Sequence, residues 1–395
     1  MHVNNNIFAE NGTISASQIS EAQRAVTVDN RIINYLRISI TDRCNLACQY
    51  CVPKETLPAL SHESIARYEE IHKIVVCASQ LGISKLRITG GEPLLRKGVF
   101  SFLKGLSQIE GINDISITTN GVLLESHIDE ILAAGVNRIN ISLDTLKPDR
   151  FRAISGKDLF ETVWRGIMAS LDRGLTPIKL NAVILRGIND DEIEDLARLS
   201  VIYPFHVRFI EYMPMGNSAV DISQQVLIPE IRQRIEHAIG KLEPVTRGML
   251  NAKSSILDGS SVGGSGSIGS NSGYIGAHEA GPAKRYKIEG ALGEIGFISP
   301  VSSHFCHECN RLRLTSTGHL RPCLLNNREI DVLTPLRQGA SNEAIKKLFL
   351  HAIQSKPAAH SLHDANDNGN INNDGIIVKT LKCNRVDTQM STIGG

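Results

Sequence analysis

Hydrophobic and polar residues follow two different periods in the first half of the chain. Short runs rich in β-branched residues, typical of strands, fall at residues 35–40, 85–89, 114–118, 138–142, 178–184 and 206–211. Apolar residues at helical spacing fall between them, at residues 65–78, 99–107, 125–134, 160–173 and 191–201. Strands that alternate with helices predict an α/β fold with a parallel sheet, which we expect to curl into an incomplete (β/α)6 barrel.

The pattern changes in the second half of the chain. Residues 251–283 are dominated by Ser and Gly, as in GSSVGGSGSIGSNSG, which is typical of a flexible insertion without a core. Strand-like runs at 285–289 and 294–299 and a helical segment at 343–354 follow. We therefore expect a flexible arm at residues 1–30, a partial barrel at 31–250, the insertion at 251–283 and a smaller C-terminal α+β region at 284–395.

The composition narrows the classes of function. Of the 395 residues 42% are hydrophobic and 21% charged, and a net charge of +1 gives no general field to hold nucleic acid or an anionic membrane. No apolar run approaches the roughly 20 residues of a membrane-spanning helix, and the polar N-terminal arm resembles neither a secretory signal nor a transit peptide. We expect a cytoplasmic protein without nucleic-acid or membrane partners. In that compartment thiols stay reduced, so clustered cysteines indicate metal binding or catalysis.

A cysteine triplet follows the first predicted strand, with Cys44, Cys48 and Cys51 in a C-x3-C-x2-C spacing. Because the chain has only eight cysteines, such a triplet is rare by chance. Three thiolates on one loop can hold three irons of a 4Fe–4S cube and leave the fourth iron open. Structural zinc prefers four protein ligands, and this loop offers three. The triplet therefore predicts a 4Fe–4S cluster with an open iron.

A second triplet, Cys306, Cys309 and Cys323, has the spacing C-x2-C-x13-C. Its short pair is a weaker signal, and three histidines lie close to it in the sequence: His304, His307 and His319. From the residues alone, a zinc site and an iron–sulfur cluster are equally good interpretations. The isolated Cys77 and Cys383 are expected to be inert thiols.

Several sequence segments carry a family resemblance. The first triplet lies in LRISITDRCNLACQYC, and Gly-Gly-Glu-Pro at 90–93 follows the second predicted strand. Together these resemble the radical S-adenosylmethionine (SAM) superfamily, whose members bind SAM at the open iron and cleave it to a 5′-deoxyadenosyl radical. Further segments occur in the order of the GTP 3′,8-cyclase family, also called the molybdenum cofactor biosynthesis protein A family: LRITGGEPLLRKG, ITTNGVLL, RINISLDTL, RFIEYMPMGN, FCHECNRLRLT and the terminal Gly-Gly. The resemblance covers residues 31–395 apart from the insertion and an Asn-rich stretch at 360–374.

The resemblance implies a lyase that begins molybdopterin cofactor synthesis. In that family the radical abstracts the ribose 3′ hydrogen of GTP. The substrate radical then closes on guanine carbon 8 to give (8S)-3′,8-cyclo-7,8-dihydroguanosine 5′-triphosphate. The resemblance also implies that the second triplet holds a second 4Fe–4S cluster, whose open iron binds the guanine base.

Site residues are implied by the same resemblance. Four residues are implied to contact SAM: Tyr50, Gly91, Ser142 and Met213. Seven residues are implied to bind GTP: Arg37, Arg87, Thr118, Lys179, Arg311, Leu312 and Arg313. Lys85 is added to these GTP contacts because it shares a strand face with Arg87. Five residues are implied to act in the reaction: Arg37, Arg311, Arg313, and Gly394 and Gly395 of the C-terminal tail.

Residue spacing independently favours an anion site. Lys85 and Arg87 lie two positions apart, as do Arg311 and Arg313, so each pair points to one face of a strand. A cationic strand face can simply be solvated. In a barrel, however, one strand face lies in the lumen and the other packs on helices, so an anion pocket accounts for the pairs better.

Two other classes of function stay open at this point. A radical SAM enzyme that modifies peptides can carry extra clusters in its C-terminal part. A non-enzymatic iron–sulfur electron-transfer protein would need fully ligated clusters. The partners implied by the resemblance are GTP, an electron donor such as flavodoxin or ferredoxin, and the cyclic pyranopterin monophosphate synthase that takes over the product. The sequence leaves the oligomeric state open, a homodimer included.

Overall fold

The computed structural model describes residues 27–28, 31–51, 60–136, 138–215, 218, 220–245 and 281–360, and two short strands at 370–371 and 377–378. Most of the predicted insertion and the C-terminal Gly394 and Gly395 therefore lie outside the described residues. Within the described part of the chain, no helix combines the length and apolar character needed to cross a membrane.

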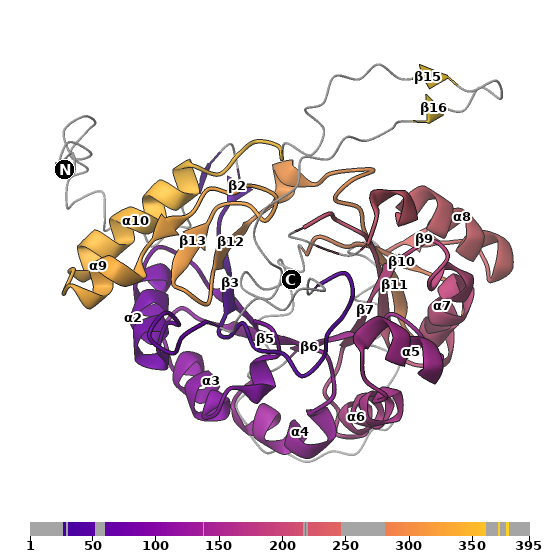
Figure 1. Ribbon diagram of the computed structural model, residues 1–395, viewed down its shortest axis with the longest axis horizontal. Helices are drawn as coiled ribbons and strands as arrows, with labels where there is room; N and C mark the ends of the chain where they lie inside the picture. Colours follow the sequence, from indigo (N-terminus) through magenta and orange to yellow (C-terminus); the bar gives the residue numbers. More distant parts are fainter. Residues whose placement is uncertain are drawn as a thin grey trace, which may run out of the picture.

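A parallel sheet forms the wall of an open barrel (Figure 1). Its six central strands are neighbours in chain order: β3 (Tyr35–Ser39), β4 (Lys85–Thr89), β5 (Asp114–Thr119), β6 (Arg138–Ser142), β7 (Ile178–Ile184) and β8 (His206–Glu211). Each pair of neighbours is parallel. The incomplete parallel barrel predicted from strand–helix alternation is thus confirmed.

The C-terminal region extends this sheet at both edges. β11 (Glu294–Ile298) pairs in parallel with β8, and β12 (Arg311–Leu314) pairs in parallel with β3. Antiparallel strands continue the sheet: β10 (Lys284–Lys287) and β9 (Glu243–Pro244) beyond β11, and β13 (His319–Arg321) and β14 (Ile330–Asp331) beyond β12. Two short pairs stand apart from this sheet: β1 (Thr27–Val28) with β2 (Arg31–Ile32), and β15 (Asn370–Ile371) with β16 (Ile377–Val378). The second cysteine triplet thereby comes to lie in the same barrel as the first.

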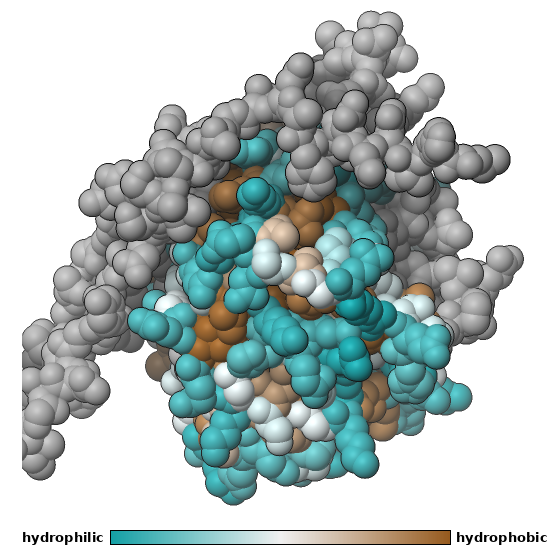
Figure 2. Space-filling model, turned by 90° about the vertical axis from the view of Figure 1, so that its left-hand side faces the viewer, coloured by the Kyte–Doolittle hydropathy of each residue, from teal (hydrophilic) through white to brown (hydrophobic). Residues whose placement is uncertain are grey.

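Helices cover the outside of the barrel (Figure 1). They are α2 (Tyr68–Ser79), α3 (Val99–Ser107), α4 (Leu124–Ala133), α5 (Pro148–Ser155), α6 (Phe160–Asp172), α7 (Ile193–Ile202), α8 (Ile228–Ala238), α9 (Leu333–Arg337) and α10 (Asn342–Gln354). α2 buries Ile71, Ile74, Val75 and Ala78 at helical spacing, as an amphipathic helix on a sheet should. α10 packs on α2, and the side of the molecule that carries α2, α9 and α10 is mostly hydrophilic with small hydrophobic areas between (Figure 2).

Strand register divides the barrel wall into a core face and a lumen face. Leu312, Leu36 and Leu86 occupy one register row and are fully buried in the hydrophobic core between sheet and helices. The next row along the strands contains Arg313, Arg37 and Arg87, whose side chains face the lumen. Because side chains alternate along a strand, this register places the arginines of three neighbouring strands side by side.

Candidate active site

A cavity of about 280 Å³ lies at the carboxyl ends of the parallel strands, and both cysteine triplets line it. Cys44, Cys48 and Cys51 come from the loop after β3, and the other triplet comes from the segments that flank β12 and β13. The predicted SAM contacts Tyr50, Gly91, Ser142 and Met213 also line the cavity. So do five of the predicted GTP contacts: Arg37, Arg87, Thr118, Arg311 and Arg313. Ligands of parallel α/β sheets bind at this end of the strands.

The Gly90–Gly91 turn after β4 packs directly on the first cysteine loop. The Gly91 amide donates to the Thr41 carbonyl oxygen at 2.7 Å, and the Glu92 amide donates to the Arg43 carbonyl oxygen at 2.8 Å. A Cβ atom at Gly91 would lie 2.2 Å from the Arg43 oxygen, so no larger residue fits without moving the loop. Glycine here lets the end of β4 reach the loop that carries the cysteines.

Glu92 ties the ends of β4 and β5 together. Its Oε1 accepts from the Leu94 amide at 3.1 Å and the Thr119 hydroxyl at 2.8 Å, and its Oε2 accepts from the Asn120 amide at 2.7 Å. Burial raises the pKa of Glu92 to about 7, although these three hydrogen bonds act to lower it. The side-chain amide of Asn120 in turn lies 3.7 Å from the Cys44 sulfur. The carboxylate thus supports the wall of the cavity next to the cysteine loop.

Asp144, which follows β6, supports the same loop from the other side. Its Oδ2 accepts from the Tyr50 hydroxyl at 2.6 Å, and its Oδ1 accepts from the Val183 amide at 2.8 Å. Burial raises the pKa of Asp144 to about 6, against the hydrogen bond from Tyr50. Asp144 was not among the predicted site residues. The available signal was a carboxylate two positions after the end of a barrel strand, where such residues reach the site.

The helix α5 anchors the first cysteine loop from outside. The Ala47 amide donates to the Ser155 carbonyl oxygen at 2.8 Å, and the Gln49 amide donates to the Ile154 carbonyl oxygen at 3.1 Å. α5 begins with Pro148 in its first turn and is closed by Gly156 at φ 74°. The loop is therefore held by main-chain hydrogen bonds at the end of a helix that the hydrophobic pattern did not predict.

The thiols of the first triplet fit a metal cluster. Burial raises the pKa of Cys48 well above its ordinary value and that of Cys51 to about 12, and Asp144 and the neighbouring thiols add to this. Burial also raises the pKa of Cys44. Without metal these raised pKa values keep the thiols protonated; a 4Fe–4S cube would displace the protons and bind one thiolate at each of three corners. In the described part of the chain no three His, Cys, Asp or Glu side chains already surround a single ion position.

The second triplet lies in a more positive environment. Cys306 and Cys309 bound the short turn η5 (Cys306–Glu308), with the Cys309 amide donating to the Cys306 carbonyl oxygen at 3.1 Å. Burial raises the pKa of Cys309, but the charges of Arg311 and Lys356 outweigh it and bring the pKa to about 6. Cys309 is therefore poised to be a thiolate at neutral pH, as a metal ligand must be.

The three histidines that made zinc a competitor are dispersed. His304 lines the cavity. The side chain of His307 is 73% exposed and lies 3.6 Å from Glu308, and His319 in β13 hydrogen-bonds the Thr317 hydroxyl at 3.1 Å. Of these three histidines, only His304 thus lies in the cavity, and they do not form a set of zinc ligands.

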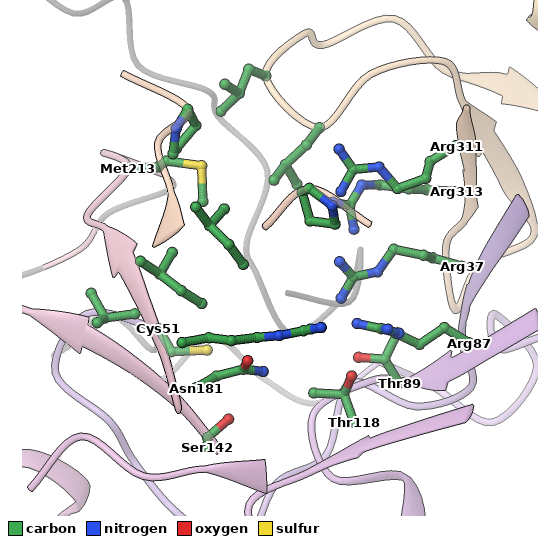
Figure 3. Close-up of a pocket in the computed structure, with 18 of the residues that line it drawn as sticks. Arg37, Cys51, Arg87, Thr89, Thr118, Ser142, Asn181, Met213, Arg311 and Arg313 are labelled. Atoms are coloured by element: carbon green, nitrogen blue, oxygen red, sulfur yellow. The ribbon is translucent and has the colours of Figure 1, made fainter. Parts of the chain in front are cut away.

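Four arginines point into the cavity from one side (Figure 3). They are Arg37, Arg87, Arg311 and Arg313, from β3, β4 and β12. Burial, together with the charges of Arg313 and Arg87, lowers the pKa of Arg37 well below its ordinary value. Burial and the charge of Arg311 lower the pKa of Arg313 to about 9. Like charges brought together out of water favour binding of an anion that bridges them.

The opposite side of the cavity carries the residues near the first cysteine loop. Figure 3 shows Cys51, Ser142, Asn181 and Met213 across from the arginines. Among the described residues, the buried Asn181 Oδ1 and the hydroxyl of Thr118 have no hydrogen-bond partner. Buried polar atoms are usually satisfied, so these two atoms favour a polar ligand in the cavity. Asn181 was missed from the sequence, where its signal was period-two spacing from Lys179 in β7.

Three predicted GTP contacts do not line the cavity. Lys85 and Lys179 lie two residues before Arg87 and Asn181 on the same strand faces, nearer the amino ends of the strands. Leu312 is fully buried in the core between sheet and helices. Gly394 and Gly395 lie outside the described residues.

Arg208 in β8 is a cavity residue that the motifs did not indicate. It is buried, and its Nη1 donates to Asn140 Oδ1 at 3.4 Å. Its sequence signal was weak, because a single arginine in the hydrophobic run HVRFIE has no paired cation beside it.

Comparisons with known proteins agree with this geometry. The Radical SAM superfamily model matches residues 38–200, and the Molybdenum Cofactor Synthesis C model matches residues 267–362. The structure of Streptococcus suis SuiB bound to S-adenosylmethionine superposes with a TM-score of 0.50 and 14% identity, over 80% of this chain and 65% of that one. At this identity the similarity concerns the fold. An open barrel with a three-cysteine loop at the carboxyl ends of its strands defines a radical SAM enzyme.

Curated relatives define the family within that class. GTP 3′,8-cyclase of Heliobacterium modesticaldum is 43% identical over 335 residues, 85% of this chain and 94% of that protein. The enzyme of the same name from Thermodesulfovibrio yellowstonii is 45% identical over 335 residues, 85% of this chain and 95% of that protein. The chain belongs to the GTP 3′,8-cyclase family of radical SAM enzymes. Membership brings SAM and a 4Fe–4S cluster as cofactors, and the first triplet fits that cluster.

Proposed function

We propose that this protein converts GTP to (8S)-3′,8-cyclo-7,8-dihydroguanosine 5′-triphosphate, the first step of molybdopterin cofactor synthesis. The observation that carries the proposal is the row of Arg37, Arg87 and Arg313 across the cavity from the first cysteine loop. A triphosphate needs several fixed cations, and guanidinium groups bind phosphate oxygens in pairs. The arginine row therefore supports a nucleoside triphosphate as the substrate. The cysteine loop on the facing wall of the cavity supports a radical source there.

The residues of the first cysteine loop would hold the radical source. Cys44, Cys48 and Cys51 would ligate three irons, with SAM on the fourth iron. When bound, the cluster and SAM supply an electron and a 5′-deoxyadenosyl radical. Gly91 lets the main chain after β4 approach the loop, and Asp144 fixes the Tyr50 ring beside it.

A second 4Fe–4S cluster on Cys306, Cys309 and Cys323 belongs to this proposal. One observation supports it over zinc: among His304, His307 and His319 only His304 lines the cavity, and His360, which also lines it, has its Nε2 at 2.7 Å from the Pro300 carbonyl oxygen. In this arrangement the guanine base lies toward the second triplet and the triphosphate toward the arginines. The ribose then lies between the two triplets.

The side chains would act chiefly by binding and positioning. Arg37, Arg311 and Arg313 neutralise the triphosphate and hold the ribose in one orientation, which lowers the entropy that must be lost in the transition state. The unpartnered Thr118 hydroxyl and Asn181 Oδ1 can satisfy ribose or base groups. Arg208, also in the cavity, is a further candidate for the phosphates. Lys85 and Lys179, on the same strand faces nearer the strands' amino ends, stay candidates for long-range charge stabilisation.

The proposal includes partners that the chemistry requires. Reduction of the first cluster needs an electron donor such as a flavodoxin or ferredoxin, and the product suits direct hand-off to cyclic pyranopterin monophosphate synthase. The reducing cytoplasm, where cysteines stay available as cluster ligands, is the compartment that fits this chemistry.

One anaerobic assay tests the function. Reconstituted protein is incubated with SAM and dithionite, with and without GTP, and 5′-deoxyadenosine and the cyclised nucleotide are both measured. We expect GTP to yield the cyclised nucleotide together with 5′-deoxyadenosine, whereas ATP at the same concentration should yield none of it. Release of 5′-deoxyadenosine without any change to GTP would contradict the proposal and favour a peptide or another substrate.

A further inference from the structure

The three cysteines of the second triplet come from two separate chain segments, and one buried lysine bridges these segments. Lys356 follows α10 and is only 5% exposed. Its Nζ donates to the carbonyl oxygen of Arg311 at 2.8 Å and to that of Pro322 at 2.7 Å. Arg311 lies two residues after Cys309, and Pro322 directly precedes Cys323. A single ammonium group therefore sets the distance between the two ligand-bearing segments.

A second cation connects the remaining cysteine to the same lysine. Arg31 in β2 is 4% exposed. Its Nη1 donates to the carbonyl oxygens of Cys306 at 3.1 Å and Pro357 at 2.9 Å, and its Nη2 donates to that of Lys356 at 3.3 Å. Lys356 thus binds the main chain beside Cys309 and Cys323 directly. Arg31 connects the main chain of Cys306 to the segment that carries Lys356.

The ammonium group of Lys356 lies where its positive charge would stabilise a negatively charged metal cluster. Burying an ammonium group is unfavourable unless hydrogen bonds and opposite charge compensate. Cluster-bound thiolates at Cys309 and Cys323 would attract the ammonium, which lies against both ligand-bearing segments. The two carbonyl acceptors satisfy two of its three N–H groups, which leaves the third for the thiolate side.

We propose that Lys356 is a positioning residue for the second cysteine triplet. It holds the Cys309 and Cys323 segments at the spacing at which all three thiolates bind one cluster, and it fixes a positive charge beside that cluster. A nearby positive charge favours the reduced, more negative form of a cluster, so Lys356 also raises the reduction potential. This inference rests on the second cluster proposed above.

Three variants test it, with iron content and the reduction potential of each cluster followed by electron paramagnetic resonance. Lys356→Met removes both the donors and the charge, and it should lower the iron content from about eight to about four per chain. GTP-independent release of 5′-deoxyadenosine from the first cluster should persist. Lys356→Gln keeps a neutral donor and should retain part of the second cluster, at a lower reduction potential. Lys347→Met, at an exposed lysine of α10, the helix that precedes Lys356, is the matched control and should behave as wild type.

The outcomes separate the two proposals. A wild-type protein with four irons and one zinc would overturn the second cluster itself. Two fully occupied clusters with unchanged potentials in Lys356→Met would overturn the role of Lys356 alone. If Lys356→Met loses both clusters, the Lys356→Gln variant tests the positioning role instead. A full second cluster at the wild-type reduction potential in Lys356→Gln contradicts that role. Loss of both clusters in Lys356→Gln contradicts it as well.

Discussion

The Tyr50 hydroxyl donates a 2.6 Å hydrogen bond to Asp144, 94 positions further along the chain. Tyr50 lies between Cys48 and Cys51, so this bond connects the first cysteine loop to the end of β6. Asp144 also accepts the Val183 amide at the end of β7. One buried carboxylate therefore determines where the loop lies relative to two barrel strands.

Replacing Asp144 by Ala should weaken SAM binding more than cluster binding. The substitution leaves the Tyr50 hydroxyl and the Val183 amide without their partner, which costs about 1–3 kcal/mol for each buried group. We expect the dissociation constant for SAM to rise about 10-fold or more while the first cluster keeps its iron. Equilibrium binding of SAM to anaerobic protein measures this. Asp158→Ala, at an exposed carboxylate, is the control, and unchanged SAM affinity in Asp144→Ala would show that the Tyr50 contact does not matter for the cofactor.

Arg313→Met should have effects of opposite sign on stability and on GTP binding. In the ligand-free protein Arg313 lies beside Arg37 and Arg311, so removing its charge relieves repulsion and should leave the free energy of unfolding unchanged or about 1 kcal/mol higher. GTP affinity should fall roughly 10- to 100-fold, because a charge-assisted contact to phosphate is lost. Urea unfolding and GTP titration measure the two effects. Arg165→Met, at a 56% exposed side chain paired with Glu125, should change neither, and a parallel loss of stability in Arg313→Met would contradict the repulsion argument.

The two cysteine triplets should fail separately. Cys48→Ala should remove one cluster and all cleavage of SAM, because the open iron that binds SAM is lost. Cys323→Ala should keep the first cluster and GTP-independent cleavage but abolish GTP cyclisation. Iron analysis should give about eight irons per chain in the intact protein and about four in each variant. Cys77→Ala, at a buried thiol away from the cavity, should retain both clusters.

The barrel strands were the most predictable part of the fold. The bounds of β4, β6, β7 and β8 agree with the β-branched runs to the residue. Such strands are buried on both faces, so their composition leaves a continuous signal in the sequence. α5 left none, because this short helix buries only two large apolar side chains, Phe151 and Ile154. It nevertheless holds the first cysteine loop.

The site was predictable where residues lie close together in the sequence, and not where they meet only through pairing of distant strands. The cysteine triplets and the arginine pair of β12 have fixed short spacings. Arg313 meets Arg37 through a parallel pairing that no local pattern encodes. Lys356 reaches the second triplet from the end of a helix, and a lone lysine there is indistinguishable in sequence from a surface charge. Asp144 likewise meets Tyr50 only in the folded chain, although its position two residues after β6 was a signal in the sequence.

Deletion of Gly394 and Gly395 should separate cyclisation from radical formation. Two consecutive glycines have little bulk and great main-chain freedom, which suits them to enter a narrow cavity. We expect both clusters and SAM binding to persist, while GTP cyclisation falls by about two orders of magnitude, roughly 3 kcal/mol of lost positioning. Product analysis after a single turnover measures it. Cyclisation at the wild-type rate would assign the tail no part in the reaction.

Glu92 should make the stability of the cluster-free protein depend on pH. Burial raises its pKa from 4.5 to about 7, so the folded state holds the proton more tightly than the unfolded state does. The protonated form therefore stabilises the fold, and this contribution is present below pH 4.5 and is lost as the pH rises to about 7. A shift of this size corresponds to about 3 kcal/mol.

Urea unfolding of wild type and Glu92→Gln at pH 5 and at pH 7.5 measures this loss. The variant has no carboxyl group to titrate and should lose about 2 kcal/mol less than wild type over that interval, because part of the contribution is already lost at pH 5. At pH 5 it should be about 1–3 kcal/mol less stable than wild type, because its amide group is placed against the Asn120 amide, which donates to the carboxylate. Glu110→Gln, at an exposed carboxylate, should follow wild type at both pH values. If Glu92→Gln and wild type lose equal stability, the hydrogen bonds from Thr119 and Asn120 compensate the burial of Glu92 in full, and the carboxylate is charged throughout this range.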